Sequence, residues 1–347
     1  MAEIIVNAMF GRGLGGLERS FAHVSAALRL AGFRVLSVVS EDAAIAAQLP
    51  TDAEIAGIRQ TSKWDLGAIL RLQQLRNRLR PAAILTHGAR AGALFTHALG
   101  GRTPHAAMLH SARLKQLNRF DMVITVTRTL AQAAIDAGVA PARVRHVPNF
   151  LLDASARPPR TPAGNVRLGF LGRLSPEKGA DRLIDALLHR RASGGAPVCL
   201  RIAGDGSERA ALEKRAAPLG ADVRFLGWQA DPTAFLAETD VLVAPSRAEV
   251  FGLVILEAWR SGAAVVATRA DGPLELIRDG QDGLLSSGEP GPMAASLDRV
   301  IANSELRQRL VSSGRARLAE FDITAAAPAL AAAMRDLINA RAARFAP

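Results

Sequence analysis

The chain has 347 residues, of which 49% are apolar, and this is enough for two domains of ordinary size with separate cores. Its single cysteine, Cys199, excludes a disulfide within the chain and fits a reducing cytoplasm. The formal net charge of +11 is concentrated in residues 1–150, which hold 18 basic and 9 acidic residues against 25 and 23 in the rest. This asymmetry predicts an anionic partner for the first half, either nucleic acid or an anionic membrane surface, unless the arginines are merely solvated.

The first half alternates short apolar strands with helical stretches, a pattern that favours parallel α/β sheets. It begins with a predicted strand at 4–8 instead of a basic segment and a long apolar stretch, so we expect no signal peptide. No apolar segment approaches the about 18 residues that a membrane span requires. The further predicted strands are 35–40, 83–86, 106–110 and 122–127, and the predicted helices are 17–31 and 68–80.

A linker is predicted at 153–162, because this segment has three prolines and no apolar periodicity. The second half then repeats the pattern, with strands at 166–171, 198–203, 223–226, 241–244 and 264–267 and helices at 179–191, 207–217 and 253–260. We therefore expect an α/β fold of two Rossmann-like, doubly wound domains facing across a cleft. Their predicted bounds are 1–155 and 165–327, with a final helix at about 328–347 packing back on the first domain.

Ligands of such sheets bind at the carboxyl ends of the strands, so the strand-to-helix turns are the candidate sites. The first turn holds Gly11, Gly13 and Gly16, which match G-x-G-x-x-G, and the second strand ends at Glu41, near the place of a ribose-binding acid. This favours a Rossmann-type NAD(P)-binding oxidoreductase as the main alternative function. The match is loose, because two residues separate the glycines from the end of the strand.

A second turn carries two cations. The strand at 166–171 leads into Gly172 and Arg173, and Lys178 follows at the start of a helix. An arginine fork and a compact ammonium group beside a helix N-terminus suit a diphosphate whose negative charge grows as it leaves. The alternative is a pair of solvated surface charges.

A third segment places Glu249 and Glu257 on either side of an almost wholly apolar helix start. Burying a carboxylate is costly without partners, and sugar hydroxyls are suitable partners because one carboxylate accepts two of them. The alternative is a capping acid followed by a solvated helix residue.

In order and spacing, these motifs resemble the family 4 retaining glycosyltransferases of the GT-B fold. The resemblance covers most of residues 165–290, through 170–186, 202–211, 223–228 and 241–285. In the first half it is carried only by the turn Gly15-Gly16-Leu17-Glu18-Arg19, by His110 and by Val147-Pro148-Asn149. The sequence departs from the family's usual residues at Trp259-Arg260, Ala263-Ala264 and Asp271, so the donor sugar and base do not follow from the resemblance.

The resemblance implies a role for each motif. Arg173 and Lys178 would hold the donor diphosphate, and Glu257 would accept hydrogen bonds from the ribose. Glu249 would hold the donor sugar together with the backbone of Phe251, Gly252 and Leu253. Gly15 and Gly16 would complete the phosphate site from the other domain. His110 would lie near the reacting centre, with His87 as a second candidate.

The expected reaction is retaining, metal-independent transfer of a hexose from a nucleotide-diphospho-sugar, a UDP-sugar above all, to a glycan or lipid-linked acceptor. We expect no further cofactor and no metal, because the sequence has neither an Asp-x-Asp pair nor a Cys/His cluster. The expected setting is the synthesis of lipopolysaccharide or another cell-envelope polysaccharide. A non-catalytic sugar-binding relative would be expected to lose one of the four charged residues, and all four are present.

The basic first domain is the expected acceptor side. Residues 71–80 form a basic amphipathic helix with Leu72, Leu75 and Leu79 on one face, and Arg113, Lys115 and Arg119 form a second basic run. Both suit anionic lipid head groups, so we predict a peripheral enzyme on the inner face of the bacterial cytoplasmic membrane. The alternative is a core-facing helix with solvated arginines. Nucleic acid is not an expected partner, because the basic half has almost no aromatic residues.

Overall fold

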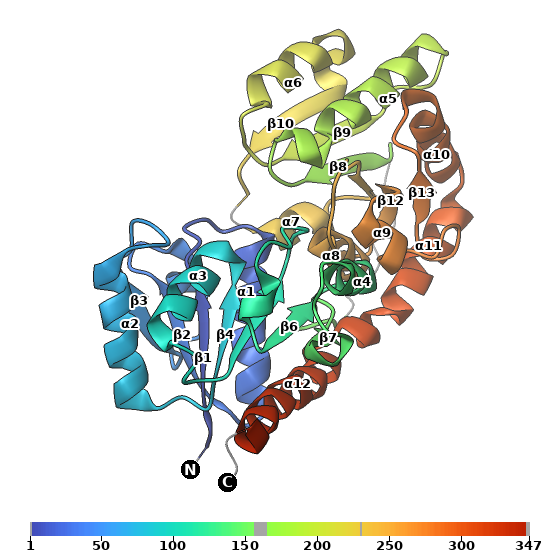
Figure 1. Ribbon diagram of the computed structural model, residues 1–347. Coiled ribbons are helices and arrows are strands. Elements are labelled where there is room, and N and C mark those ends of the chain that lie inside the picture. The colour runs from blue at the N-terminus through green and yellow to red at the C-terminus, as the bar shows by residue number, and fades with distance from the viewer. Residues whose placement is uncertain (1, 156–164, 230, 345–347) are drawn as a thin grey trace. The chain divides into compact units, whose positions relative to one another are not determined.

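The computed structural model describes residues 2–155, 165–229 and 231–344. The chain divides into two compact units, Met1–Asp153 with Phe321–Pro347, and Ala154–Glu320 (Figure 1). Most of the predicted linker lies outside the described residues, and each unit is considered by itself below.

The first unit contains a parallel seven-stranded sheet in the order β3-β2-β1-β4-β5-β6-β7. Its strands are β1 (Ile4–Met9), β2 (Arg34–Ser40), β3 (Glu54–Ile58), β4 (Ala83–His87), β5 (His105–Leu109), β6 (Met122–Thr125) and β7 (Val144–His146). Its helices are α1 (Gly16–Leu30), α2 (Leu66–Leu79), α3 (Gly88–Leu99), α4 (Arg128–Asp136) and α12 (Ile323–Arg344), and α12 packs on α1. The strand order reverses between β1 and β4, which is where open α/β sheets bind ligands.

The second unit contains a parallel six-stranded sheet in the order β10-β9-β8-β11-β12-β13. Its strands are β8 (Arg167–Leu171), β9 (Cys199–Ala203), β10 (Val223–Gly227), β11 (Val241–Ala244), β12 (Ala264–Thr268) and β13 (Leu284–Ser286). Its helices are α5 (Ala180–Ala192), α6 (Arg209–Ala216), α7 (Pro232–Ala237), α8 (Leu253–Ser261), α9 (Asp271–Leu276), α10 (Pro290–Ala302) and α11 (Ser304–Ala316). Here the strand order reverses between β8 and β11.

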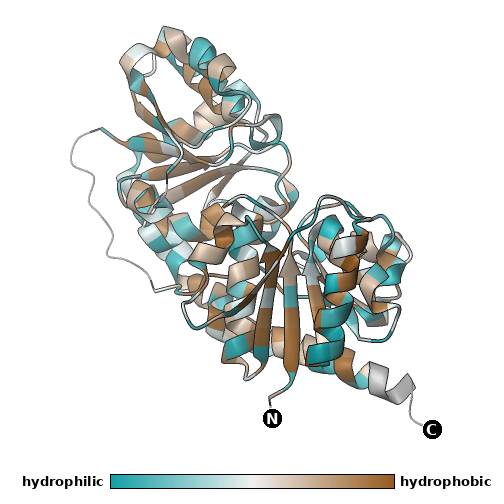
Figure 2. Cartoon of the chain, turned by 90° about the vertical axis from the view of Figure 1, so that its left-hand side faces the viewer, coloured by the Kyte–Doolittle hydropathy of each residue, from teal (hydrophilic) through white to brown (hydrophobic). Residues whose placement is uncertain are grey.

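Both sheets are covered by helices, so their central strands are buried and mostly apolar. Every residue of β4, β11 and β12 is buried, and Figure 2 shows the apolar colouring following the strands. The predicted pairing of apolar strands with amphipathic helices is confirmed in both units.

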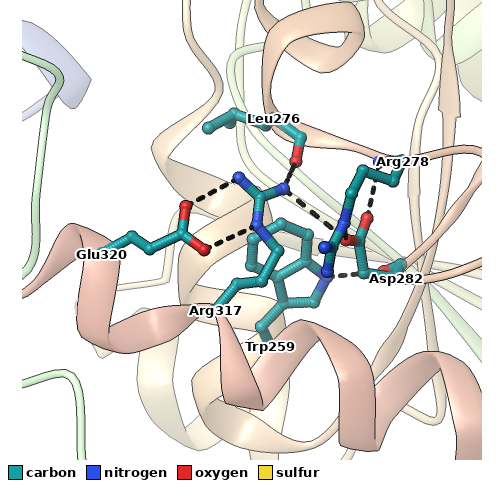
Figure 3. A network of polar contacts seen from close by, with 6 residues as sticks. All are labelled: Trp259, Leu276, Arg278, Asp282, Arg317 and Glu320. Atoms are coloured by element: carbon teal, nitrogen blue, oxygen red, sulfur yellow. Dashed lines mark hydrogen bonds and ion pairs between the residues drawn. The ribbon is translucent and has the colours of Figure 1, made fainter.

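A polar network around the buried carboxylate of Asp282 links α8 to the segments before β13 and after α11 (Figure 3). The indole of Trp259 is fully buried on α8, and its N–H donates to the backbone oxygen of Asp282 at 2.9 Å. The buried carboxylate of Asp282 forms ion pairs with Arg278 at 2.6 Å and with Arg317 at 3.5 Å. Arg317 also pairs with Glu320 at 3.0 Å. The guanidinium of Arg317 also lies 5.8 Å from the centroid of the Trp259 ring, so this unusual residue joins α8 to the segment after α11.

Helix α2 does not present the apolar stripe expected for a lipid surface. Leu72 is fully buried, and Leu75 and Leu79 pack against the core of the first unit. This stripe is therefore a core face, as the alternative reading of residues 71–80 predicted. In the parts of the chain that the structure describes, no helix combines the length and the apolar character needed to cross a bilayer.

Candidate active site

The loop after β8 is seated on the backbone of the loop after β9. The N–H of Leu174 donates to the carbonyl of Asp205 at 2.9 Å, and the N–H of Gly172 donates to that of Ala203 at 3.0 Å. Only glycine fits at position 204, because its φ is +138° and a Cβ would lie 1.8 Å from the Gly172 oxygen. This seating fixes the loop that carries Arg173, whose side chain is exposed to solvent.

Lys178 ends a 3₁₀ turn at Pro176–Lys178, and the next residue, Gly179, begins the approach to α5. Gly179 has a φ of +68°, and a Cβ there would lie 2.2 Å from the Pro245 oxygen, so the loop after β8 contacts the loop after β11 backbone to backbone. This contact brings two predicted site residues together. The Nζ of Lys178 lies 2.5 Å from Oε2 of Glu249, an oxygen that also accepts from Ser246 Oγ at 3.4 Å.

The loop that carries Glu249 is fixed at three further points. The N–H of Arg247 donates to the Glu177 carbonyl at 2.8 Å, and its guanidinium pairs with Asp181 at 2.6 Å. This arginine lowers the pKa of the Asp181 carboxyl. The carbonyl of Glu249 itself accepts from the N–H of Gly272 at 2.8 Å. Three loops, those after β8, β11 and β12, are therefore joined at the carboxyl edge of this sheet.

The remaining residues predicted for the second unit lie on or just before α8. Phe251 is buried, Gly252 precedes the helix with a φ of +96°, and Leu253 is its first residue. Glu257 is the fifth residue of α8 and is 7% exposed, so a carboxylate is buried after a wholly apolar first turn. The interpretation of Glu257 as a solvated helix residue is thus wrong.

In the first unit, the glycine-rich turn after β1 is held by a carboxylate. Oε2 of Glu18 accepts from the N–H of Gly15 at 2.9 Å, and Gly15 precedes the first residue of α1, Gly16. A Cβ at Gly11 would lie 2.4 Å from Oε1 of the same glutamate. The amide at the helix start is thus already engaged by an anion, which is a poor arrangement for the pyrophosphate of a dinucleotide. Glu41 follows β2 and is exposed.

The two candidate histidines of the first unit contact each other. His87 ends β4, and His110 follows β5. The Nδ1 of His87 lies 2.9 Å from Nε2 of His110, and its Nε2 lies 2.9 Å from Oδ1 of Asn7. Burial lowers the pKa of His110 to about 4 and that of His87 well below its ordinary value. Sequence reasoning assigned no role to Asn7, although a polar side chain inside the apolar strand β1 is a signal that it has buried partners.

Among the described residues, no three or more His, Cys, Asp or Glu side chains gather in a way that could hold a metal ion. The charged residues predicted for the site in the second unit are two cations, Arg173 and Lys178, and two carboxylates, Glu249 and Glu257.

Two family models match the chain, one in each half. Residues 165–303 match "Glycosyl transferases group 1", and residues 14–151 match "Glycosyltransferase Family 4". Together with the two doubly wound parallel sheets, these matches define a glycosyltransferase of the GT-B class. The chain belongs to glycosyltransferase family 4, and its function as a glycosyltransferase is confirmed together with the predicted fold.

Similar proteins cover the chain to different extents. The lipopolysaccharide core biosynthesis glycosyltransferase LpsE of Rhizobium meliloti is 31% identical over 314 residues, which is 88% of this chain and 91% of the relative. The phosphatidyl-myo-inositol mannosyltransferase of Mycobacterium leprae is 36% identical over 174 residues, 46% of this chain and 45% of that protein. The structure of Anabaena HepE in complex with UDP and glucose has a TM-score of 0.83 at 24% identity, covering 96% of this chain and all of HepE.

Proposed function

We propose that the chain transfers a hexose, with retention of anomeric configuration, from a nucleotide-diphospho-sugar that binds at the carboxyl edge of the second sheet. The observation that carries this proposal is the contact between Lys178 and Glu249. Lys178 and Arg173 both belong to the loop after β8. A cation for phosphate oxygens and a carboxylate for sugar hydroxyls stand side by side there. A nucleotide-sugar presents these two chemical groups next to each other.

The proposed roles follow the chemistry of each side chain. Arg173 and Lys178 bind the diphosphate, and Glu257 accepts hydrogen bonds from the ribose. Glu249 binds the sugar with the backbone at the start of α8, formed by Phe251, Gly252 and Leu253. From the first unit, Gly16 contributes its backbone N–H to the phosphate, and Gly15, whose own N–H is bound by Glu18, lets the turn approach it closely. His110 lies near the reacting carbon. UDP is the proposed nucleotide, since HepE has been solved in complex with UDP and with UDP-glucose.

Bond breaking leaves negative charge on the departing phosphate, and two fixed cations stabilise it most at that moment. The bond from the anomeric carbon to the phosphate oxygen breaks while the bond to the acceptor oxygen forms on the same face of the sugar. The acceptor's proton passes to the departing phosphate oxygen. Because Arg173 and Lys178 supply the positive charge, we propose that no metal is required, and turnover should survive removal of divalent ions with a chelator.

The proposed acceptor is a lipopolysaccharide core or another cell-envelope glycan carried on a lipid. The name of the Rhizobium relative, which aligns over nearly the whole chain, supports this choice. The excess of basic residues in 1–150 also suits a phosphorylated glycolipid and the inner face of the cytoplasmic membrane.

Exposed apolar side chains around the start of α2 support the membrane proposal. Trp64, Leu66 and Leu70 are 60%, 74% and 58% exposed at the start of α2, and Lys63 and Arg71 beside them are exposed as well. Interfacial binding uses this combination, in which apolar side chains enter the head-group region and cations contact anionic lipid.

Sedimentation with vesicles of phosphatidylglycerol and phosphatidylethanolamine tests this patch. Leu66→Ser with Trp64→Ser should lower binding at low salt by on the order of tenfold, because each buried CH₂ contributes about 0.8 kcal/mol. Leu30→Ser is the matched control, since Leu30 is 60% exposed on α1 and outside the patch. Equal binding of both variants, or no binding of the unaltered protein, would contradict the proposal.

Thermal denaturation with a panel of nucleotides tests the donor proposal. A nucleoside diphosphate at about 100 times its Kd should stabilise the fold by about 2.7 kcal/mol, and the matching nucleotide-sugar should do so too. NAD(P) should have no effect. Stabilisation by NAD(P) alone would favour the oxidoreductase alternative and contradict the donor site.

A further inference from the structure

In the first unit, Asn7, His87 and His110 are joined in this order by buried hydrogen bonds, and we call these three residues the relay. Asn7 lies fully buried within β1, and its Nδ2 lies 2.9 Å from Ser25 Oγ and 3.3 Å from the Phe21 carbonyl. Its Oδ1 faces Nε2 of His87, and Nδ1 of His87 faces Nε2 of His110. Every contact between the three residues is 2.9 Å, which is a normal hydrogen-bond length.

The direction of each hydrogen bond follows from the backbone carbonyl of Phe21. A backbone carbonyl only accepts, so the Asn7 group that faces Phe21 must be the NH₂, and the group that faces His87 must be the oxygen. His87 therefore carries its proton on Nε2. When His87 is neutral, its Nδ1 has a lone pair and accepts from Nε2–H of His110. Neutral His110 is then left with an unprotonated Nδ1.

Burial keeps both histidine rings of the relay neutral. His87 is 1% exposed and packs edge-on against Phe21, so an imidazolium there would be costly. The lowered pKa values of both histidines leave both rings neutral near pH 7. In this state His110 offers Nδ1 only as a hydrogen-bond acceptor.

We propose that Asn7 and His87 are positioning residues that fix the tautomer of His110, so that its Nδ1 accepts a hydrogen bond from a substrate hydroxyl. His110 then orients that hydroxyl, and it does not donate a proton through Nδ1. The assignment of a tautomer rests on the hydrogen bonds alone. The contact with substrate rests on the proposed function.

Nitrogen-15 NMR of the histidine side chains tests the tautomer without any assay of activity. The chain has seven histidines, and His110→Gln identifies the signal of His110 by its loss. The expected result near neutral pH is a His110 ring protonated on Nε2 and unprotonated on Nδ1. A ring protonated on Nδ1, or an equal mixture of tautomers, would overturn the proposal.

Two variants of the relay should move that signal in different ways. His87→Phe keeps the ring volume but removes the acceptor, so His110 should become a mixture of tautomers. His87→Gln supplies an amide oxygen for His110 and an N–H for Asn7, so it should restore most of the Nε2–H form. His105→Gln is the control, because His105 is equally buried but bonds to Thr86, outside the relay. An unchanged His110 signal in His87→Phe would contradict the role of His87.

Activity then separates this proposal from the proposed function. His87→Phe should lower kcat by on the order of tenfold, which is about the net contribution of one hydrogen bond, and His87→Gln should recover part of it. If the tautomer is as predicted but no variant of His110 or His87 changes turnover, the relay stands and the assigned role of His110 fails. If the tautomer is wrong while Lys178→Ala abolishes turnover, the relay fails and the donor site stands.

Discussion

Glu249 and Lys178 form a preassembled pair, and this explains how a lysine is kept in position at an open loop. The Lys178 side chain is 32% exposed and that of Glu249 16%, so the pair is partly shielded from water. A bound diphosphate would share the ammonium group with Glu249. The carboxylate would then be free to accept hydrogen bonds from sugar hydroxyls as well.

The two glutamates should therefore differ in what they recognise. Glu249→Gln should weaken binding of a nucleotide-sugar by on the order of tenfold, the effect of one or two hydrogen bonds to a charged acceptor, while leaving the nucleoside diphosphate nearly unaffected. Glu257→Gln should weaken both ligands alike, because its proposed partner is the ribose. Calorimetric titration of both ligands measures this, and equal losses in Glu249→Gln would contradict its assignment to the sugar.

At the scale of the elements, the sequence predicts every interior strand but only one of the four edge strands, β10, which was expected at 223–226 and spans Val223–Gly227. Strand β11 has the predicted bounds 241–244, and β1, β4 and β12 differ from prediction by one residue at one end. The three missed strands, β3, β7 and β13, are all edge strands. Only Ile58 is buried in β3, and no residue is buried in β7. An edge strand lacks the continuous apolar run by which a buried strand is recognised.

The packing of α8 against α11 gives a sharp stability prediction. A Cβ at Gly314 would lie 2.4 Å from Cδ1 of the buried Trp259 ring, which is too rigid to move aside. Gly314→Ala should lower the free energy of unfolding by about 1–3 kcal/mol, although alanine is the better helix former.

Gly291→Ala on α10 is the matched control. Its Cβ would be 3.6 Å from the nearest atom, so this variant should be neutral or slightly stabilising. Urea denaturation measures both variants. Equal stability of the two would mean that the Trp259 contact does not constrain the second unit.

At the scale of the whole molecule, buried histidines make the first unit sensitive to acid. Burial lowers the pKa of His105 to about 3 and that of His110 to about 4, and it lowers that of His87 as well. Unfolding restores ordinary pKa values of about 6.5, so the unfolded chain binds more protons below that pH. The free energy of unfolding of this unit is thus unaffected by these histidines above about pH 6.5 and decreases as the pH falls toward 4.

Each of these groups should contribute a slope of up to about 1.4 kcal/mol per pH unit to the free energy of unfolding. Hydrogen exchange at about pH 7 and pH 5, read by mass spectrometry, should show protection falling in β4 and β5. His105→Gln should reduce this slope by up to about 1.4 kcal/mol per pH unit, the contribution of one proton. Stability that does not change between these pH values would contradict the burial of neutral histidines.

The site was only partly predictable from the sequence. The strand-to-helix turns indicated Arg173, Lys178, Glu249 and Glu257, but the contact between Lys178 and Glu249 spans 71 residues of sequence and depends on β8 and β11 being neighbours. The sequence predicts no role for Asn7, because a single polar residue in a strand gives no spacing pattern. Its importance depends on His87, 80 residues away, which only the pairing of β1 with β4 brings near.

The most direct test is the release of nucleoside diphosphate during sugar transfer by variants of the two cations. Arg173→Ala and Lys178→Ala should each lower kcat by on the order of 10²–10³-fold, as expected for groups that stabilise charge in the transition state. Lys214→Ala is the matched control, because Lys214 is exposed on α6 of the same unit, and its turnover should equal that of the unaltered protein. Unchanged turnover in both Arg173→Ala and Lys178→Ala would contradict the donor site.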